Sequence, residues 1–211
     1  MNDTRNSVAT EADGARPWLD AAYQVLITQG VDKIRIATLA DSVASTRTAF
    51  YWHFASRGAL LQALLDRWKA KNTGNFLHQI GSYAETINEA VFNMFDCWLD
   101  DALFDAPFDL AVRNWAKNDP ALTEMLADAD QQRIDGLIAM FLRFGYDDAT
   151  ALIRAHTVYF TQIGYISMMI VDDPVVRIER MPDYVTVYTG IPPSAAEIAR
   201  FRGRHDHRLG A

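Results

Sequence analysis

Segment 46–53 brings hydrogen-bonding and aromatic side chains together within a chain of 211 residues. If Ala49, Phe50 and Phe54 face a protein core, helical spacing turns four other side chains to the opposite face. These four are Arg47, Thr48, Tyr51 and Trp52. An arginine near the start of a helix can form two hydrogen bonds with guanine, and hydroxyl groups donate to phosphates or bases. The face therefore predicts contact with double-stranded DNA.

Other hydrogen-bond donors surround this face. Thr46 and His53 stand at its two ends, and Thr38 lies in the preceding helical pattern, where it could touch a phosphate. Other interpretations stay open for three of these residues. Tyr51 and Trp52 also fit a protein contact or a partly buried face, and Thr38 also fits an ordinary solvated threonine.

Short helices are needed to hold these side chains, and the apolar spacing predicts them. Apolar residues recur at helical intervals over 15–30 and again over 36–43. Only Ala44 and Ser45 separate the second pattern from Thr46, which is the expected N-cap of a third helix over 47–53. Two short helices joined by so tight a turn are typical of a helix-turn-helix, whose second helix enters the major groove.

Longer helices are predicted in the remainder of the chain. A fourth helix follows the N-cap candidate Ser56 and continues past Lys71 to a weak point at Gly74. Further helices are expected over 87–98, 110–117, 120–145 and 148–170, with 100–109 as a loop or short helix and a tail after Pro174. Segment 184–188 fits either strand or helix. We therefore predict an all-α fold, with an N-terminal three-helix bundle containing the helix-turn-helix and a C-terminal helical domain.

Charge is distributed unevenly along the chain. The net charge is −7, yet residues 1–72 carry nine Lys and Arg against seven Asp and Glu, whereas residues 73–211 carry eleven against twenty. A mildly basic head on an acidic body fits a DNA-contacting end and a remainder that does not bind DNA. Neither a long apolar run nor a secretory signal is readable, so we expect no membrane span and a cytoplasmic location.

Residues 15–68 resemble the N-terminal domain of the tetracycline-repressor (TetR) family. The resemblance rests on Gly30, Ile34, Leu39, Ala40 and Val43, on TRTAFYWHF at 46–54, and on Ser56, Leu60 and Leu61. It implies a homodimeric repressor whose C-terminal helical domain binds a small-molecule inducer and which then releases a palindromic operator. The expected division is a flexible tail (1–14), a helix-turn-helix DNA-binding domain (15–55), a connecting helix (56–74) and a ligand-binding and dimerisation domain (75–211).

Three positions depart from the family pattern. Ala44 stands where the family's turn usually has Gly, and Thr48 stands where Gly is common. A left-handed conformation at Ala44 would cost about 1 kcal/mol, which does not remove the fold. Arg35 stands where the family usually has a Ser or Thr cap, and it could add a phosphate contact instead.

The body resembles the family in general form, through Arg113, Trp115, Ala116, Asp119 and Pro120 and two long helices that follow. That resemblance implies a four-helix bundle between two copies, with Ile134, Leu137, Ile138, Phe141 and the Gly164 region as the surface. A ligand cavity needs apolar walls and a few polar groups. The candidates are Phe92, Phe95, Trp98, Trp115, His156, Tyr159, Gln162 and Tyr165. They favour an aromatic or hydrophobic ligand, although core packing is an alternative for each.

Other classes of protein find little support. The chain has no phosphate-binding Gly-rich loop, no Gly-x-Ser-x-Gly and no His-Glu-x-x-His, so we expect no enzyme. His205 and His207 fit solvated residues of a charged tail better than metal ligands, and we expect neither metal nor cofactor. Cys97 is the only cysteine and fits a buried inert thiol, with a redox sensor as the alternative. A helical protein-interaction module that has lost DNA binding is the main rival function.

Overall fold

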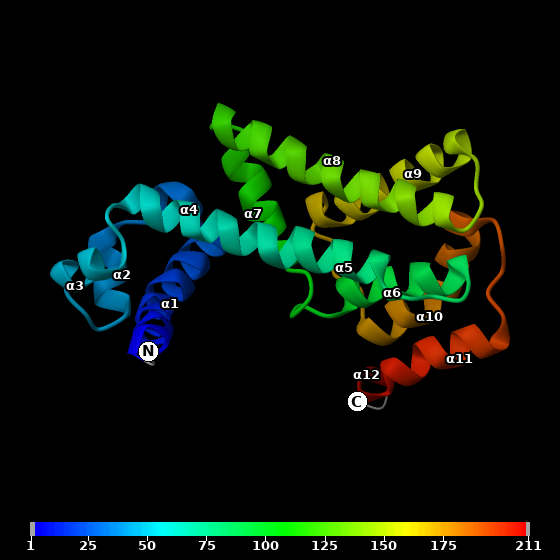
Figure 1. Ribbon diagram of the computed structural model, residues 1–211, viewed down its shortest axis with the longest axis horizontal. Helices are drawn as coiled ribbons and strands as arrows, with labels where there is room; N and C mark the ends of the chain where they lie inside the picture. The colour runs from blue at the N-terminus through cyan, green and yellow to red at the C-terminus, as the bar shows by residue number, and fades with distance from the viewer. Residues whose placement is uncertain (1–2, 210–211) are drawn as a thin grey trace. The chain divides into compact units, whose positions relative to one another are not determined.

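The computed structural model describes residues 3–209, with side chains for residues 14–208, and every regular element in that range is helical (Figure 1). The all-α prediction is therefore confirmed. The described chain divides into two compact units, each with its own core. The first contains the residues up to Lys69 together with Pro107–Thr123, and the second contains Ala70–Ala106 and the residues from Glu124 onward.

The first unit packs short and long helical segments around aromatic and aliphatic side chains. These segments are α1 (Asp3–Gln29), η1 (Val31–Lys33), α2 (Ile36–Ser42), α3 (Arg47–His53), α4 (Arg57–Trp68) and most of α7 (Ala106–Ala116). Phe50 of α3 is fully buried, and its ring meets the edge of Trp18 of α1 at 5.3 Å between centroids. The Trp68 indole donates to the buried Asp109 carboxylate at 2.9 Å, which fastens α7 to α4.

Helix ends in this unit follow from their capping residues. The Thr46 and Ser56 side chains accept hydrogen bonds from the amides of Ala49 and Ala59, so both predicted N-caps are confirmed. Between α2 and α3, Ala44 has a left-handed φ of 50°. The Ser45 amide donates to the Ala40 carbonyl at 2.9 Å and the Ala44 amide donates to Asp41 at 3.3 Å. This is a Schellman turn, with alanine where glycine is usual.

The start of α1 differs from the expected tail over residues 1–14. The structure extends α1 back to Asp3, whereas Met1 and Asn2 lie outside the described residues. The apolar stripe that defines the helix in the sequence begins only near Ala15, because the preceding residues are mostly polar. A helix can continue through such residues without a buried stripe when alanine and glutamate favour it, so periodicity alone places the start too late.

The second unit is built from long helices. Its elements are the π-helical turn η2 (Lys69–Gly74), α5 (Asn75–Gly81), α6 (Ile87–Leu99), most of α8 (Pro120–Arg143), α9 (Asp148–Ser167), α10 (Pro174–Thr189), α11 (Ala195–Arg204) and α12 (Asp206–Leu209). The chain stays helical through the expected weak point at Gly74. Asp147 caps α9 by accepting from the Thr150 amide at 2.9 Å, and Gly145 has a φ of 85° after α8.

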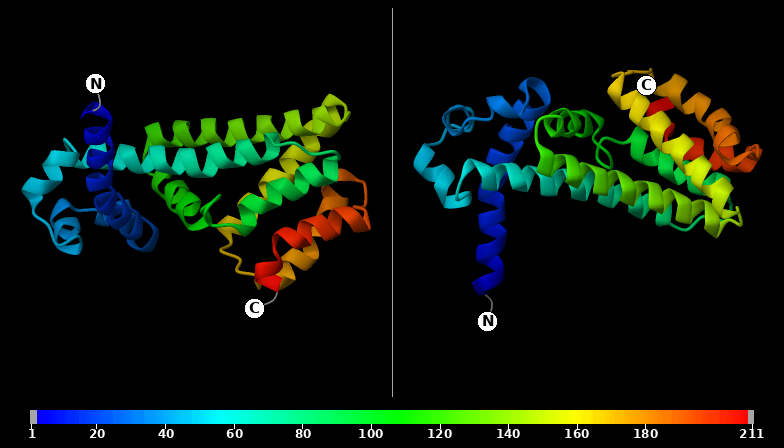
Figure 2. Two further views of the ribbon diagram at one scale, coloured as in Figure 1. Left: turned by 60° about the horizontal axis from the view of Figure 1, so that its bottom comes forward. Right: turned by 90° about the horizontal axis from the view of Figure 1, so that it is seen from above.

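The expectation of a tail after Pro174 is wrong. Helices α10, α11 and α12 occupy it, and α10 and α11 pack against α6 (Figure 2). Asp173 caps α10 through the amides of Val175 and Val176, and Ser194 and Glu197 form a capping box at α11. Pro182 within α10 obscures the helical pattern, but its position requires only that one backbone hydrogen bond be lost. Segment 184–188, which fits strand or helix by its sequence, is helical.

The apolar stripe expected to form a dimer surface on α8 is covered within the chain itself. Ile134, Leu137 and Phe141 are buried and Ile138 is half-buried, so the expectation that they meet a second copy is wrong. These side chains are part of the core of the second unit, because an amphipathic helix buries its apolar face against its neighbours. Exposed apolar side chains lie instead on α9, at Leu152, Ile153 and Phe160.

Candidate functional site

The second helix of the helix-turn-helix exposes the side chains that the sequence singled out. Arg47, Thr48, Tyr51 and Trp52 are all exposed on α3, with Tyr51 at 56% and Trp52 at 79% of their full accessible surface. Arg35, Thr38 and Thr46 are exposed as well. The structure thus places seven of the eight candidates on the surface of the first unit, while Phe50 anchors α3 from behind.

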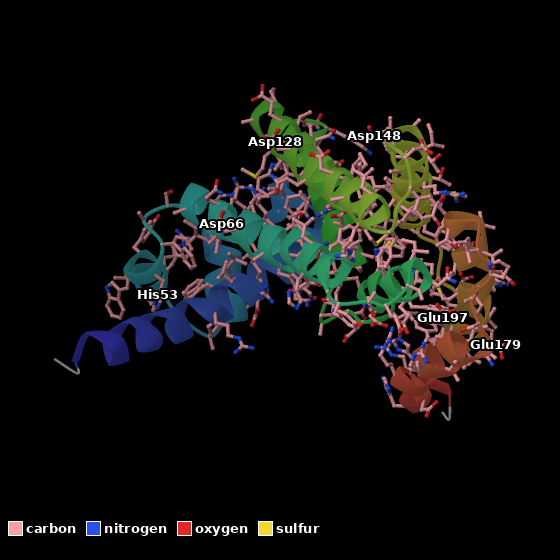
Figure 3. The ribbon with its side chains drawn as sticks, turned by 45° about the vertical axis from the view of Figure 1, so that its right-hand side comes forward. His53, Asp66, Asp128, Asp148, Glu179 and Glu197 are labelled. Atoms are coloured by element: carbon pink, nitrogen blue, oxygen red, sulfur yellow. The ribbon has the colours of Figure 1, made fainter. Side chains whose placement is uncertain are left out.

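His53 is the exception among these candidates. It is half-buried, and a Cβ built on Gly14 would lie 2.6 Å from the nearest ring carbon of His53 (labelled in Figure 3). The imidazole therefore packs against the backbone of α1 at a glycine, where any side chain would displace it. Nothing in the sequence signals this contact, because Gly14 precedes the periodic part of α1.

Arg57 braces the helix-turn-helix, a role that no sequence pattern indicates. Its guanidinium donates to the carbonyls of Ile34 and Val31, each at 2.7 Å. These bonds join the start of α4 to η1 and to Ile34, the residue that follows it. A half-buried arginine directed at backbone carbonyls stiffens the scaffold and is not available for phosphate, which distinguishes it from the exposed Arg35 and Arg47.

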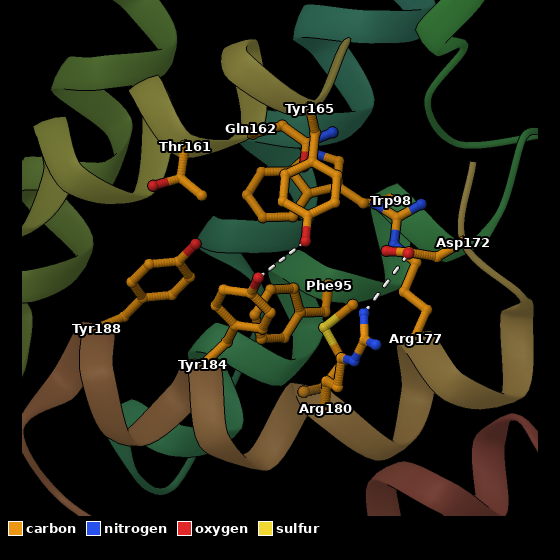
Figure 4. A pocket seen from close by; sticks show the side chains of 11 residues that line it. Phe95, Trp98, Thr161, Gln162, Tyr165, Asp172, Arg177, Arg180, Tyr184 and Tyr188 are labelled. Carbon is orange, nitrogen blue, oxygen red and sulfur yellow. Dashed lines mark hydrogen bonds and ion pairs between the residues drawn. The ribbon is translucent and has the colours of Figure 1, made fainter. Parts of the chain in front are cut away.

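A separate cavity lies in the second unit between α6, α9 and α10 (Figure 4). About 360 Å³ of space, part of it open to solvent, separates its side chains. The lining residues are Phe95, Trp98, Thr161, Gln162, Tyr165, Asp172, Arg177, Arg180, Met181, Tyr184 and Tyr188. Apolar walls with a few converging polar groups are typical of sites for small organic molecules.

Half of the eight sequence candidates for ligand contact meet at this cavity, namely Phe95, Trp98, Gln162 and Tyr165. The other four lie elsewhere. Phe92 stacks on Phe201 at 4.4 Å in the core, and Tyr159 donates to Asp130 at 2.6 Å. His156 lies beside the exposed Phe160, and Trp115 belongs to α7 in the first unit.

Helix α10 supplies the cavity residues that sequence reasoning missed. Arg177, Arg180, Tyr184 and Tyr188 project from this helix, at the spacing of one helical face. A signal for the helix is present in the sequence, since Asp173 and Pro174 form an N-cap and N1 pair. Interpreting the segment as a tail leaves its arginines and tyrosines out of the candidate site.

Two pairs of polar groups line the cavity, and Arg177 belongs to neither pair. Arg180 pairs with Asp172 at 3.5 Å, and the hydroxyl groups of Tyr165 and Tyr184 share a hydrogen bond of 2.8 Å. Arg177 lies over the Tyr165 ring at 5.9 Å. That hydrogen bond, followed by burial, raises the pKa of Tyr165, and burial raises the pKa of Tyr188 to about 12. Both phenols are therefore protonated donors at neutral pH.

The sequence also raises expectations for two histidines near the C-terminus and for the single cysteine. His205 is buried and pairs with Asp96 at 2.9 Å, so the expectation that it is solvated is wrong, whereas His207 is exposed. Among residues 14–208, no cluster of His, Cys, Asp and Glu is suited to hold a metal ion. Cys97 is fully buried, and burial raises its pKa to about 12, which matches the inert thiol expected.

No helix within the described part of the chain has the length and apolar character needed to cross a membrane.

Comparison with known proteins adds independent information on the first unit. Residues 19–64 match the family described as bacterial regulatory proteins, tetR family. The matched range contains η1, α2 and α3 and most of α4, and so includes the whole exposed face built on α3.

Similar proteins agree with that match. The HTH-type transcriptional regulator TtgR from Pseudomonas putida is 40% identical over 48 residues, which is 23% of this chain and 23% of TtgR. The uncharacterized HTH-type transcriptional regulator TtgW from the same species is 34% identical over 61 residues, or 29% of this chain and 46% of TtgW. The similarity thus spans less than half of either relative.

A solved structure resembles a larger share of the chain. SCO7518 from Streptomyces coelicolor A3(2) superposes with a TM-score of 0.58 and 15% sequence identity, covering 84% of this chain and 99% of that protein. At this identity the likeness concerns the fold. It extends the shared helical architecture beyond the residues that the family match covers.

Proposed function

We propose that this chain, whose N-terminal domain belongs to the TetR family of bacterial regulatory proteins, binds a DNA operator and regulates transcription. The observation that carries the proposal is the exposed face of α3. Arg47, Thr48, Tyr51 and Trp52 lie on this face, while the buried Phe50 fixes the helix beneath them. Because the operator would lie on the bacterial chromosome, we propose that the protein acts in the cytoplasm.

Each exposed side chain on α3 suits a particular part of DNA. Arg47 follows the N-cap at the start of the helix, where its guanidinium can reach the O6 and N7 atoms of guanine. The Thr48 and Tyr51 hydroxyls can donate to phosphates or bases, and the Trp52 ring offers apolar surface to a thymine methyl group or a sugar. Arg35 and Thr38 are exposed near the same turn and would contact phosphates.

The same proposal includes a homodimer and a palindromic operator. Leu152, Ile153 and Phe160 of α9 are exposed apolar residues, with exposed fractions of 40%, 63% and 57%. Large apolar side chains gathered on one helix mark a surface that another protein covers. A second copy would cover this surface symmetrically and present two recognition helices to two half-sites.

Regulation by a small molecule is the third part of the proposal. The cavity between α6, α9 and α10 has the aromatic walls and the few polar groups that such a ligand requires. A ligand that binds the form of the protein with low DNA affinity more tightly would release the operator, since a ligand shifts an equilibrium only through differential affinity. We therefore propose a repressor that is induced by its ligand.

Selection of bound sequences from a random duplex pool, at fixed salt, tests the proposal. We expect enrichment of a palindrome by the wild-type protein. Arg47→Ala should weaken binding to that palindrome by about tenfold or more, because it removes a bidentate contact worth about 1–3 kcal/mol. Tyr51→Ala should also weaken it, because it removes a hydroxyl donor from the same face. Binding to unrelated duplex should change much less.

Matched controls exist for both substitutions. Arg16→Ala removes the same charge from an exposed position on α1, and Tyr83→Ala removes a tyrosine that is 89% exposed outside the helix-turn-helix. Both controls should retain wild-type affinity for the palindrome. If the folded dimer enriches no sequence, the protein is a helical interaction module and not a DNA-binding regulator.

A further inference from the structure

We propose that the cavity between α6, α9 and α10 binds an aromatic carboxylate, with its anionic group paired to Arg177 and its ring among the aromatic side chains. The inference rests on the proposed function, because it names the chemical class of effector for the same site. It goes further than that function in assigning an anchoring residue and a charge to the ligand.

Arg177 is a cation in a cavity wall with an unused hydrogen-bonding fork. It is half-buried, and burial lowers the pKa of its guanidinium, although the group stays charged at neutral pH. Among the described residues, none accepts a hydrogen bond from Arg177 and no carboxylate lies within ion-pair distance; its close contact is the Tyr165 ring. Arg180, three residues along the same helix, is already paired with Asp172.

A partly desolvated arginine gains most from an anionic partner. Burying a charge without a partner is unfavourable, and a carboxylate can accept two parallel hydrogen bonds from a guanidinium. Asp172 and Asp101 attract Arg177 from a distance, but neither completes such a pair. A cationic ligand would be repelled by Arg177, and a neutral ligand would leave its charge unanswered.

Arg177 also occupies a central position. A second hollow adjoins the first and is lined by Asp101, Phe104 and Ile170 among others; its empty space of about 410 Å³ includes space open to solvent. Trp98, Gln162, Tyr165 and Arg177 line both hollows. An anionic group bound between them can therefore pair with Arg177 while its ring extends into either one.

The hydroxyl pair next to Arg177 suits the same ligand. Tyr165 and Tyr184 have two O–H groups, and their mutual hydrogen bond uses one of them as donor. The other O–H is left to donate, and a carboxylate oxygen is a strong acceptor. Phe95 and Trp98 form the aromatic wall from α6, against which a ring can stack or meet edge to face (Figure 4).

Isothermal titration calorimetry of the full chain with three matched probes tests this inference. The probes are 2-naphthoate, its neutral amide 2-naphthamide, and the cation 2-naphthylmethylammonium. We expect 2-naphthoate to bind about tenfold or more tightly than the amide, because the charge-assisted pair with Arg177 is made only by the carboxylate. The cation should bind most weakly.

Substitution of Arg177 tests whether this residue causes the preference for 2-naphthoate over 2-naphthamide. Arg177→Met should bring 2-naphthoate and 2-naphthamide to equal affinity, and Arg177→Lys should keep a reduced preference, because lysine retains the charge but not the planar fork. Arg202→Met removes one exposed positive charge from α11 and should leave the preference unchanged. Circular dichroism checks that each variant is folded.

Several outcomes would overturn the inference. Equal binding of acid and amide to the wild-type chain would do so, as would tighter binding of the cation or no detectable heat from 2-naphthoate at millimolar concentration. Operator binding by Arg177→Met, measured without ligand, should match the wild type. If the wild-type chain binds an operator but does not prefer 2-naphthoate, the inference about the ligand is wrong while the proposed function stands. If the wild-type chain binds no operator, the proposed function itself is wrong.

Discussion

At the scale of single residues, Ala44 holds a conformation that suits glycine better. Its φ of 50° lies in the left-handed region, where the Cβ atom crowds the following carbonyl oxygen. The turn needs this conformation, because the amides of Ala44 and Ser45 close α2 through it. The strain is located at the junction between α2 and α3.

Replacing Ala44 by glycine should therefore stabilise the protein. We expect Ala44→Gly to raise the free energy of unfolding by about 0.5–1 kcal/mol, since relief of the strain exceeds the extra entropy that glycine gives the unfolded chain. Urea denaturation measures the change. Ala37→Gly, inside α2, is the matched control and should lower stability by about 1 kcal/mol. Equal losses from both variants would contradict the strain argument.

Single residues also show where sequence reasoning stops. The caps Thr46, Ser56 and Asp147 can be read from the sequence because a cap bonds within its own helix. The contact of His53 cannot, because its partner Gly14 lies far along the chain and carries no side chain to suggest a contact. Local hydrogen bonds can be predicted from neighbouring letters, whereas contacts between segments depend on how the helices pack.

At the scale of elements, one carboxylate links the N-terminus of α11 to that of α6. Glu197 closes the capping box with Ser194 and also accepts a hydrogen bond from Thr86, the N-cap residue of α6. Burial alone would raise the pKa of Glu197, but the hydrogen bonds from Thr86 and Ser194 outweigh burial and lower it below 4.5. The ionised form therefore links the two helix N-termini.

This linkage predicts a pH dependence. A carboxyl group whose pKa is lower in the folded state contributes stability above its unfolded pKa and loses that contribution as the pH falls through its folded pKa. We expect Glu197→Gln to lower the free energy of unfolding at pH 7, and the difference from wild type to shrink well below pH 4.5. Urea denaturation across this range measures both.

A matched control for this substitution is the exposed Glu179 of α10 (Figure 3). Glu179→Gln should have little effect on stability at either pH, because none of the described residues bonds to its carboxylate. A constant difference between Glu197→Gln and wild type from neutral to acid pH would show that Glu197 acts through packing and not through its charge.

Elements account for much of what the sequence does and does not predict about the cavity. The amphipathic stripe of α6 and the polar residues of α9 identify Phe95, Trp98, Gln162 and Tyr165. Helix α10 is hard to predict because Pro182 interrupts its pattern, and Arg177 lies on that helix. Which side of an apolar helix faces a cavity, and which side faces core, depends on its neighbours; Phe92 and Tyr159 face core.

At the scale of the whole molecule, the proposed homodimer depends on the exposed apolar side chains of α9. Phe160→Asp should shift the protein toward monomer, because a buried unpaired charge at a symmetric contact occurs twice per dimer. Light scattering coupled to size-exclusion chromatography measures the mass. Operator affinity should fall in parallel, since two half-sites would no longer be bound together.

Tyr83→Asp is the control for this prediction, because Tyr83 is 89% exposed and lies between α5 and α6. It should leave the mass unchanged. If Phe160→Asp remains dimeric, the second copy covers another surface, and Leu152 and Ile153 would then be excluded along with it as the centre of the contact.

The single buried cysteine has a practical consequence for spectroscopy. Cys97 is the only thiol in the sequence, has no exposed surface and stays protonated at neutral pH. Maleimide and methanethiosulfonate reagents require an accessible thiolate, so the native chain is a silent background for site-directed labelling. A cysteine introduced at an exposed position such as Thr48 would be the sole reactive site in each copy. In the proposed homodimer, spin labels at this position would report the distance between the two copies of α3 with no native cysteine removed.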